Sequence, residues 1–272
     1  MLPFLIYVGV FLLWPTFIVL VGAFQDLHGN PTLNNVTTVT SGVYLDEFKR
    51  SIELSLITAL IGAVAGGLLT WAVVGVRRGP LRQVVLAASG VLAQFGGVTL
   101  AFAFLATFGF TGMFTVFLQD HLHIDIFASG AWLYELPGLV LVYTYFQIPL
   151  MVIVFLPAMD GLRPQWREAS ETLGGTSWTY WRHVAGPILA PAFAGAVLLL
   201  FANAFSAYAT AAALVSQGSP IVPLKIADLL TSEVSLNGAN LGRALSLGMV
   251  VVVAVVMALY ALLQRRTSRW LQ

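Results

Sequence analysis

Hydrophobic residues occur in six long runs, and polar residues collect in the segments between them. The runs lie at about Leu2–Phe24, Ile52–Val76, Val84–Phe108, Gly138–Ala158, Ile188–Leu214 and Ala244–Leu263. Each run has roughly the 20 residues that a helix needs to cross a hydrocarbon core of about 30 Å. Because lipid offers no partner for free backbone N–H and C=O groups, each run is predicted to be helical. The pattern therefore predicts an all-α membrane protein, residues 1–272, with six transmembrane helices in a single domain.

Composition also indicates a membrane protein, and it argues against several other classes of protein. Of the 272 residues, 58% are hydrophobic and 9% are charged, whereas a soluble domain has about 25% charged residues. The lipid bilayer is therefore an expected partner. The net charge of +1 gives no indication of nucleic-acid binding. The chain has no cysteine, which excludes disulfides and thiolate metal sites.

Basic residues are divided unevenly between the two sets of connecting segments. One set contains nine of the 13 basic residues: Arg77, Arg78, Arg82, Arg163, Arg167, Arg182, Arg265, Arg266 and Arg269. The other set contains only Lys49, Arg50, Lys225 and Arg243. Because positive charge is retained on the cytoplasmic side, both termini and the segment 163–187 are expected to be cytoplasmic.

The segment Arg163–Pro187 is the longest polar stretch with helix-forming residues between two hydrophobic runs. Pro164 suits a first helical position, and Gln165–Leu173 are fair helix formers. Gly174–Gly175 is expected to end this helix, because glycine readily adopts the left-handed conformation found there. Such a short helix is marginal alone in water, so its apolar stripe of Trp166, Ala169 and Leu173 needs a cover.

A second short helix is predicted to follow in the same segment. Thr176 or Ser177 is expected to cap it, Trp178–Ala185 to form it, and Gly186–Pro187 to end it. An alternative interpretation treats the whole segment as a solvated loop with interfacial tryptophans.

The runs contain none of the residues that would supply energy for transport. Glu53 lies at the outer edge of the second run, and no ionisable residue lies deeper in any run. Carriers driven by protons or ions usually keep intramembrane carboxylates or histidines. A nucleotide-binding P-loop needs Gly-Lys-Ser/Thr, and neither Lys49 nor Lys225 follows a glycine. A motor for pumped transport would have to be another polypeptide.

The polar segment resembles the loop motif of ABC importer permeases, which reads Glu-Ala-Ala, three residues, Gly, nine residues, Ile, one residue, Leu-Pro. The matching positions in this chain are Glu168, Ala169, Ser170, Gly174, Val184, Gly186 and Pro187. The spacing is kept, but Ser170, Val184 and Gly186 replace the second alanine, the isoleucine and the leucine of the motif.

The resemblance implies a type I ABC importer permease architecture and a transport subunit that is not an enzyme. In that family the loop forms coupling helices that sit in a cleft of a cytoplasmic ATPase. ATP and Mg would bind to the ATPase dimer, and this chain would bind no cofactor and no metal. Further expected partners are a second permease, identical or homologous, and an extracytoplasmic solute-binding protein at a bacterial inner membrane.

The resemblance also assigns roles to residues of the loop. The expected coupling residues are Arg163, Trp166, Glu168, Ala169, Ser170, Leu173, Gly174, Gly175, Val184 and Pro187. Ala169 and Leu173 are expected to pack in the ATPase cleft. Glu168 is expected to cap the helix or form an ion pair near its start.

Length and the order of the last third resemble the spermidine/putrescine-type branch of the family, which suggests a polyamine-like solute. The alternatives are another solute, such as a phosphonate, thiamine, a ferric chelate or a sugar, and a secondary carrier or channel that works without an ATPase.

Polar residues within the runs are candidates for the translocation pathway, because polar groups avoid lipid. They are Gln94, Thr99, Tyr143, Thr144, Tyr145, Gln147, Asn203, Ser206, Tyr208 and Thr210. For each of them the alternative role is an interhelical hydrogen bond. Glycines such as Gly62 and Gly66 are expected to allow close helix packing.

Two further predictions concern the segments that are expected on the outer side of the membrane. His121 and His123 lie beside Asp120 and Asp125, and a solvated face is preferred over a zinc site there. A short helix at Leu224–Leu230 is expected to contact the binding protein, with Lys225 as a contact residue, or to form an outer gate.

Overall fold

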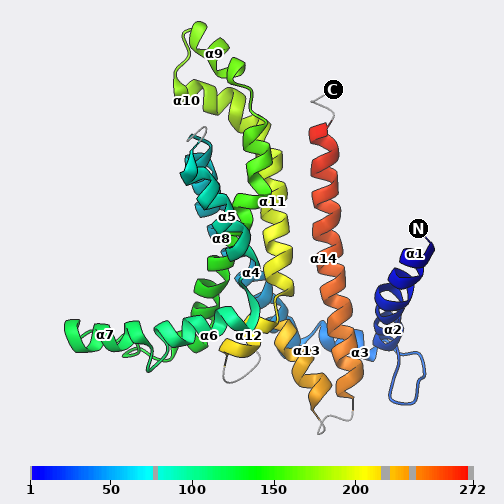
Figure 1. The fold of residues 1–272 in the computed structure, drawn as a ribbon. Helices are drawn as coiled ribbons and strands as arrows, with labels where there is room; N and C mark the ends of the chain where they lie inside the picture. The colour runs from blue at the N-terminus through cyan, green and yellow to red at the C-terminus, as the bar shows by residue number, and fades with distance from the viewer. Residues whose placement is uncertain (1, 76–78, 216–220, 233–236, 269–272) are drawn as a thin grey trace. The chain divides into compact units, whose positions relative to one another are not determined.

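The computed structural model describes residues 2–75, 79–215, 221–232 and 237–268, and this part of the chain is almost entirely helical (Figure 1). It forms two compact units. The first unit is Met1–Glu53 with Gln217–Val255, and the second is Leu54–Ser216 with Val256–Gln272. Three of the basic residues used above to infer orientation, Arg77, Arg78 and Arg269, lie outside the described residues.

Within the described part there are six helices long and apolar enough to cross a membrane, which confirms the all-α membrane fold. They are Phe4–Ala23, Gly42–Gly75, Gly97–Leu122, Leu136–Asp160, Ser177–Ser206 and Gly238–Leu263. The first, second, fourth and last overlap the predicted runs closely, although α4 (Gly42–Gly75) and α14 (Gly238–Ser268) are longer than predicted. The third and fifth differ from the prediction.

The first span contains a π-helical turn just before its proline. Helix α1 (Leu2–Val8) is followed by η1 (Gly9–Leu13) and α2 (Trp14–Ala23). The N–H of Trp14 donates to the carbonyl of Gly9, five residues earlier. Because Pro15 has no N–H and its ring crowds the preceding turn, a wider turn accommodates it without ending the helix.

The first unit contains a hydrophobic core shared by three helices. Helix α3 (Asn34–Val39), the short helix α13 (Val222–Thr231) and the first part of α14 share a buried core that includes Val39, Val222 and Leu245. The α13 helix confirms the prediction of a helix at 224–230.

Two polar contacts attach α13 to α4. The Ser51 hydroxyl accepts a hydrogen bond of 2.8 Å from the N–H of Val222, and Lys225 Nζ lies 3.5 Å from Glu47 Oε1. The Lys225 side chain is only 25% exposed. It therefore helps to hold α13 in place, and in this structure it is not a freely exposed contact for a binding protein.

In the second unit, α4 and α8 (Leu136–Asp160) pack at very short range. A Cβ atom added to Gly62 would lie 2.5 Å from the Cβ of Gln147, and one added to Gly66 would lie 2.6 Å from the carbonyl oxygen of Ile148. These two glycines confirm the expectation of close packing, because any side chain there would push the helices apart.

Replacing Gly66 with alanine should therefore destabilise the protein by roughly 1–3 kcal/mol, the usual cost of overpacking a core. The measurement is the midpoint of thermal unfolding in detergent. Gly90→Ala is the control, because Gly90 lies in a helix with no atom near its added Cβ. An unfolding midpoint of Gly66→Ala equal to that of the control would contradict the close contact.

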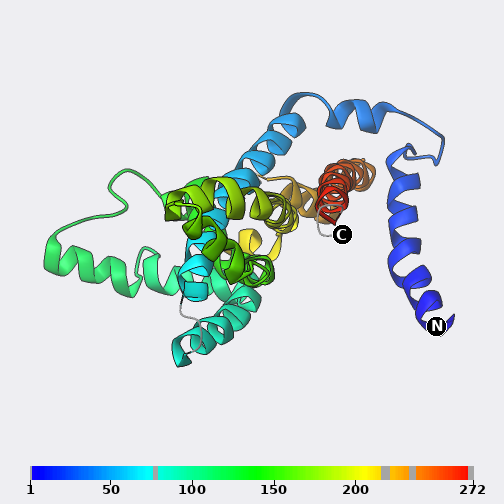
Figure 2. The same cartoon turned by 90° about the horizontal axis from the view of Figure 1, so that it is seen from above.

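The predicted third run, Val84–Phe108, is not one helix. The structure has α5 (Pro80–Gln94), a break, α6 (Gly97–Phe108) and then α7 (Met113–Leu122). Helix α5 has 15 residues, so it is only about 22 Å long. Gly97 has φ of +67°, which turns the chain away from helical geometry. Figures 1 and 2 show α6 and α7 running crosswise to α8 and α11.

The predicted fifth run, Ile188–Leu214, is also interrupted. Helix α11 (Gly186–Ser206) ends before Ala207, and α12 (Ala209–Leu214) follows in a new direction. Helix α12 packs on α6, and a Cβ on Gly97 would lie 3.7 Å from the Cβ of Ala209. The two helix breaks therefore lie next to each other. A continuous hydrophobic run reveals neither break, because periodicity reports burial and not backbone direction.

Candidate functional site

The candidate site is a helical hairpin at one end of the second unit, where α9 (Pro164–Thr172) follows α8. Arg163 precedes it in an extended conformation, and Pro164 occupies the first turn. At its other end, the N–H of Gly174 donates to Glu171 and the N–H of Gly175 donates to Ser170, at 3.0 and 2.9 Å. This pair of bonds is a Schellman motif. The predicted helix and its glycine end are confirmed.

Glycine is required at positions 174 and 175 for two different reasons. Gly174 has φ of +80°, and no atom lies within 4 Å of a Cβ added to it. The requirement at Gly174 is therefore backbone conformation alone. A Cβ on Gly175 would lie 2.7 Å from both the carbonyl oxygen and the hydroxyl oxygen of Ser170. Gly175 is required by close approach, so the chain can reverse tightly only with this pair.

The second helix of the hairpin begins as predicted but does not end as predicted. The hydroxyl of Thr176 accepts a hydrogen bond from the N–H of Thr179 at 3.3 Å and caps α10 (Ser177–Tyr180). The chain then continues through η3 (Trp181–Ala185) directly into α11. Gly186–Pro187 therefore does not stop the helix, and Ser177–Ser206 forms one helical stretch of 30 residues.

The π-helical turn η3 explains why the helix continues. The N–H of Gly186 donates to the carbonyl of Trp181, five residues earlier, and a Cβ on Gly186 would lie 2.6 Å from that same oxygen. The wide turn accommodates Pro187, and glycine at 186 leaves room for the carbonyl. Val184 and Pro187 thus lie within a continuous helix that joins the hairpin to a membrane span.

One face of α9 borders an apolar groove of about 430 Å³. Trp166, Ala169, Ser170 and Leu173 line it from α9, and Gly175, Thr179, Val184 and Ile188 complete it. Leu173 is 89% exposed. The apolar stripe that the sequence predicted is therefore uncovered in this chain.

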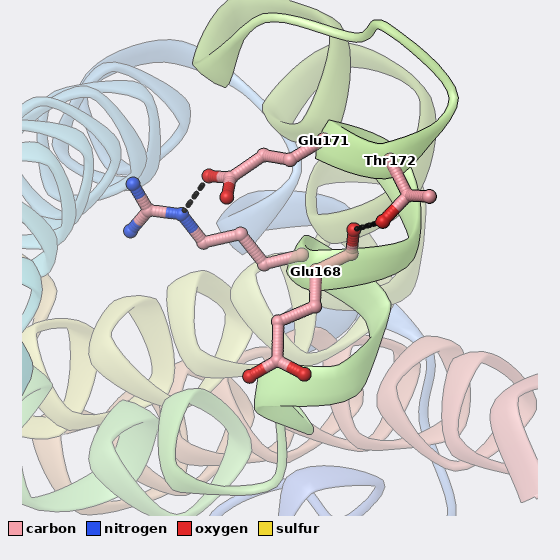
Figure 3. Close-up of polar contacts among 4 residues, drawn as sticks. Glu168, Glu171 and Thr172 are labelled. Atoms are coloured by element: carbon pink, nitrogen blue, oxygen red, sulfur yellow. Dashed lines mark hydrogen bonds and ion pairs between the residues drawn. The ribbon is translucent and has the colours of Figure 1, made fainter.

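The polar face of α9 contains one ion pair and one free carboxylate. Arg167 Nε lies 2.9 Å from Glu171 Oε1, and the Thr172 hydroxyl donates to the backbone carbonyl of Glu168 at 2.8 Å (Figure 3). The Glu168 carboxylate has no hydrogen bond or ion pair within the described residues. Glu168 therefore does not cap α9 in this chain, because α9 starts at Pro164 and the first turn ends before Glu168. An ion pair of Glu168 with a partner stays a prediction.

Two of the candidate pathway residues are buried between helices. The Tyr143 hydroxyl donates to the carbonyl of Ala207 at 2.7 Å, and Gln147 Nε2 donates to the carbonyl of Leu200 at 2.8 Å. Both side chains are fully buried. Both side chains thus make the interhelical hydrogen bonds of the alternative role: they join α8 to α11, and Tyr143 satisfies a carbonyl that the end of α11 leaves free. A pathway role for them stays a prediction.

Replacing Tyr143 with phenylalanine should lower stability by about 1–3 kcal/mol, because the partly buried Ala207 carbonyl would lose its donor. Thermal unfolding and the KM for solute uptake should be measured together. A structural role predicts a lower unfolding midpoint with an unchanged KM. A changed KM at unchanged stability would place Tyr143 in the pathway instead.

The other polar candidates mostly remain exposed. Gln94, Thr99, Tyr145, Asn203, Ser206 and Tyr208 are all exposed in this chain, whereas Thr210 is buried. Gln94 and Thr99 flank the break between α5 and α6, and Ser206 and Tyr208 flank the break between α11 and α12. The sequence did not predict this grouping, because it depends on the two breaks lying side by side.

His121 and His123 do not form a group with other potential metal ligands among the residues that the structure describes. His121 Nδ1 lies 3.3 Å from the carbonyl of Phe117, and its ring stacks on the Phe117 ring. His123 ends α7 in the left-handed conformation. No group of three or more potential metal ligands occurs among the residues that the structure describes.

The chain is similar in sequence to permease proteins of bacterial transport systems. No family model matches the chain. It is 25% identical over 173 residues to the sulfate transport system permease protein CysT of Escherichia coli K12, which covers 62% of this chain and 58% of CysT. It is 27% identical over 198 residues to the sulfate permease CysW of the same strain, covering 72% and 65%. The chain thus spans about six-tenths of the length of these curated relatives.

Solved structures show the same fold at low sequence identity. A bacterial ABC transporter that imports the acidic polysaccharide alginate matches with a TM-score of 0.72 and 16% identity, over 98% of this chain and 93% of that chain. The MetNI methionine ABC transporter matches with a TM-score of 0.57 and 15% identity, over 82% and 95%. Nothing in these matches supports the spermidine/putrescine-type branch. The chain is thus similar in sequence to transport-system permeases and similar in fold to chains of ABC transporters.

Proposed function

We propose that this chain is a permease subunit of an ATP-driven importer and that the α9–α10 hairpin couples it to a separate ATPase. The observation that carries the proposal is the hairpin itself. Its apolar groove is uncovered, its turn is fixed by Gly174 and Gly175, and α10 continues without interruption into α11. A rigid helix from hairpin to span can transmit a movement of the hairpin directly to the pathway.

The groove and the free carboxylate suggest what the ATPase surface should offer. An apolar socket would cover Ala169 and Leu173, and a basic residue would pair with Glu168. ATP and Mg would be bound by the ATPase dimer. A second permease would complete the pathway, and an extracytoplasmic binding protein would deliver the solute. The related alginate transporter was solved with a pentasaccharide-bound periplasmic protein.

The hairpin is proposed to face the cytoplasm of a bacterium, with both termini on the same side of the inner membrane. Nine of the 13 basic residues belong to this side. The ends of the second and fourth spans lie together, because their last residues, Gly75 and Asp160, line one cavity with Arg82 and Tyr180, which follow these spans. These connecting segments therefore lie at the same end of the second unit.

An anionic or neutral polar solute fits the spans better than a polyamine. Helices α5, α6 and α11 contain no Asp or Glu, and the one acidic residue of α8 is its last residue, Asp160. A polycation in the pathway would lack neutralising charges. The relatives point the same way, since they are named for sulfate, starch degradation products and alginate.

Replacing Pro164–Gly175 by a flexible Gly-Ser linker of equal length tests the coupling role and leaves the α10–α11 helix in place. An importer permease should lose ATP-dependent uptake in proteoliposomes at least tenfold and no longer retain the ATPase. A secondary carrier or channel, which is the competing function, should keep its transport rate. Uptake at the parental rate in the linker variant would overturn the proposal.

A further inference from the structure

A second concavity lies beside a different face of α9 from the apolar groove, and the coupling role leaves it unexplained. Its volume is about 1090 Å³, and it is formed by the ends of α4 and α8, the start of α5 and the hairpin, all within the second unit. From α9 and its flanking residues, the cavity is lined by Arg163, Pro164 and Arg167, whereas the groove is lined by Trp166, Ala169, Ser170 and Leu173.

The charge in this cavity is mostly positive. Arg82, Arg163 and Arg167 line it, and Asp160 is the one carboxylate among its lining residues. Arg82 Nη2 lies 2.6 Å from Asp160 Oδ2, and Arg167 uses Nε for Glu171. Each guanidinium has five N–H donors, so both arginines keep donors for another anion. Arg163 has no ion pair in the described chain and lies over the Trp166 ring at 5.9 Å.

The cavity is also lined by aromatic residues from the membrane spans. Trp71, in the last turns of α4, packs edge-to-face on Trp181 of η3 with ring centroids 6.4 Å apart. Both tryptophans line the cavity, and Trp71 is 55% exposed. Tryptophan at the end of a span is typical of the head-group level of a bilayer. A soluble anion would use only the arginines, whereas a lipid would use the arginines and the tryptophans.

We propose that this cavity binds the phosphate head group of an anionic membrane lipid, with Arg82, Arg163 and Arg167 on the phosphate and Trp71 and Trp181 beside the glycerol and acyl region. Planar guanidinium groups match phosphate geometry. Basic pockets between span ends on the cytoplasmic side are suited to anionic head groups. The proposal requires only that these span ends lie at a membrane surface, so it does not depend on the ATPase or the solute.

The test is lipid binding by the full-length chain, purified with the subunits that accompany it. Native mass spectrometry should measure retention of dioleoylphosphatidylglycerol against dioleoylphosphatidylcholine. Each arginine near a head group changes affinity by about fivefold. Arg82→Gln with Arg167→Gln should therefore weaken phosphatidylglycerol binding by about 25-fold, and leave phosphatidylcholine binding unchanged. Asp160→Asn should strengthen phosphatidylglycerol binding, because it removes the competing carboxylate.

The matched control is Lys49→Gln with Arg50→Gln, which removes the same charge from exposed residues of the first unit. Unchanged phosphatidylglycerol binding in this control is expected. Equal losses in the two double variants, no preference for phosphatidylglycerol, or weaker binding in Asp160→Asn would each overturn the proposal. Displacement of the lipid by millimolar inorganic phosphate would assign the site to a soluble anion and would also overturn it. The Asp160→Asn result decides the matter if the arginine variant does not fold.

Discussion

Replacing Leu173 with aspartate should strongly weaken ATPase binding while leaving the stability of the permease unchanged. Leu173 is 89% exposed, so the chain itself gains little from its apolar side chain. Burying a leucine at an interface is worth about 1.5–3 kcal/mol, and an aspartate there would be an unpaired charge in an apolar contact. ATPase affinity should therefore fall about 100-fold or more.

This expectation is measured as the affinity of the purified permease for its ATPase, with the thermal unfolding midpoint as the folding check. Leu33→Asp is a suitable control, because Leu33 is also highly exposed, at 65%, but lies in the first unit next to α3. The control should bind the ATPase normally. If Leu173→Asp also binds normally, the groove is not the docking surface.

Replacing Gly174 with leucine should uncouple the hairpin through the backbone alone. Gly174 has φ of +80° with no atom within 4 Å of an added Cβ, so leucine would meet no steric clash with neighbours. The left-handed conformation costs a non-glycine residue about 1–2 kcal/mol. We therefore expect the Schellman end of α9 to open and ATPase affinity to fall about 5- to 30-fold, with a matching loss of uptake.

Two companion variants separate conformation from bulk. Gly174→Asn should keep most of the affinity, because asparagine tolerates the left-handed region. Gly90→Leu adds the same side chain at an exposed helical glycine with open space around it and should have no effect. If Gly174→Leu keeps both full ATPase stoichiometry and full uptake, the turn does not position the hairpin.

The first, second, fourth and last spans and the first helix of the hairpin could be predicted because their causes are local. Long apolar runs demand helices in lipid, and Pro164 and Gly174 are start and stop signals that act on neighbouring residues. The end of the second hairpin helix could not be predicted from the same rules. Gly186–Pro187 usually breaks a helix, but the π-helical turn η3 absorbs the proline, and the same arrangement precedes Pro15 in the first span.

Whether each candidate pathway residue is buried or exposed depends on tertiary structure, which the sequence alone does not reveal. Nothing in the sequence distinguishes Tyr143 and Gln147, which are buried between α8 and α11, from the exposed Tyr145 on the same helix. The breaks after Gln94 and Ser206 were hidden within apolar runs, because hydrophobicity does not record a change of backbone direction. The exposed groove on α9 was predictable, because the apolar residues Trp166, Ala169 and Leu173 follow helical spacing and therefore lie on one face.

The central claim is that this permease works through a separate ATPase docked on the α9–α10 hairpin. The most direct measurement is a detergent pull-down of the tagged chain, with the co-purifying proteins identified by mass spectrometry and Leu173→Asp run in parallel. The account predicts a cytoplasmic ATPase and a second permease with the parental chain, and loss of the ATPase alone with the variant. A chain that purifies alone and still transports solute after reconstitution would contradict it.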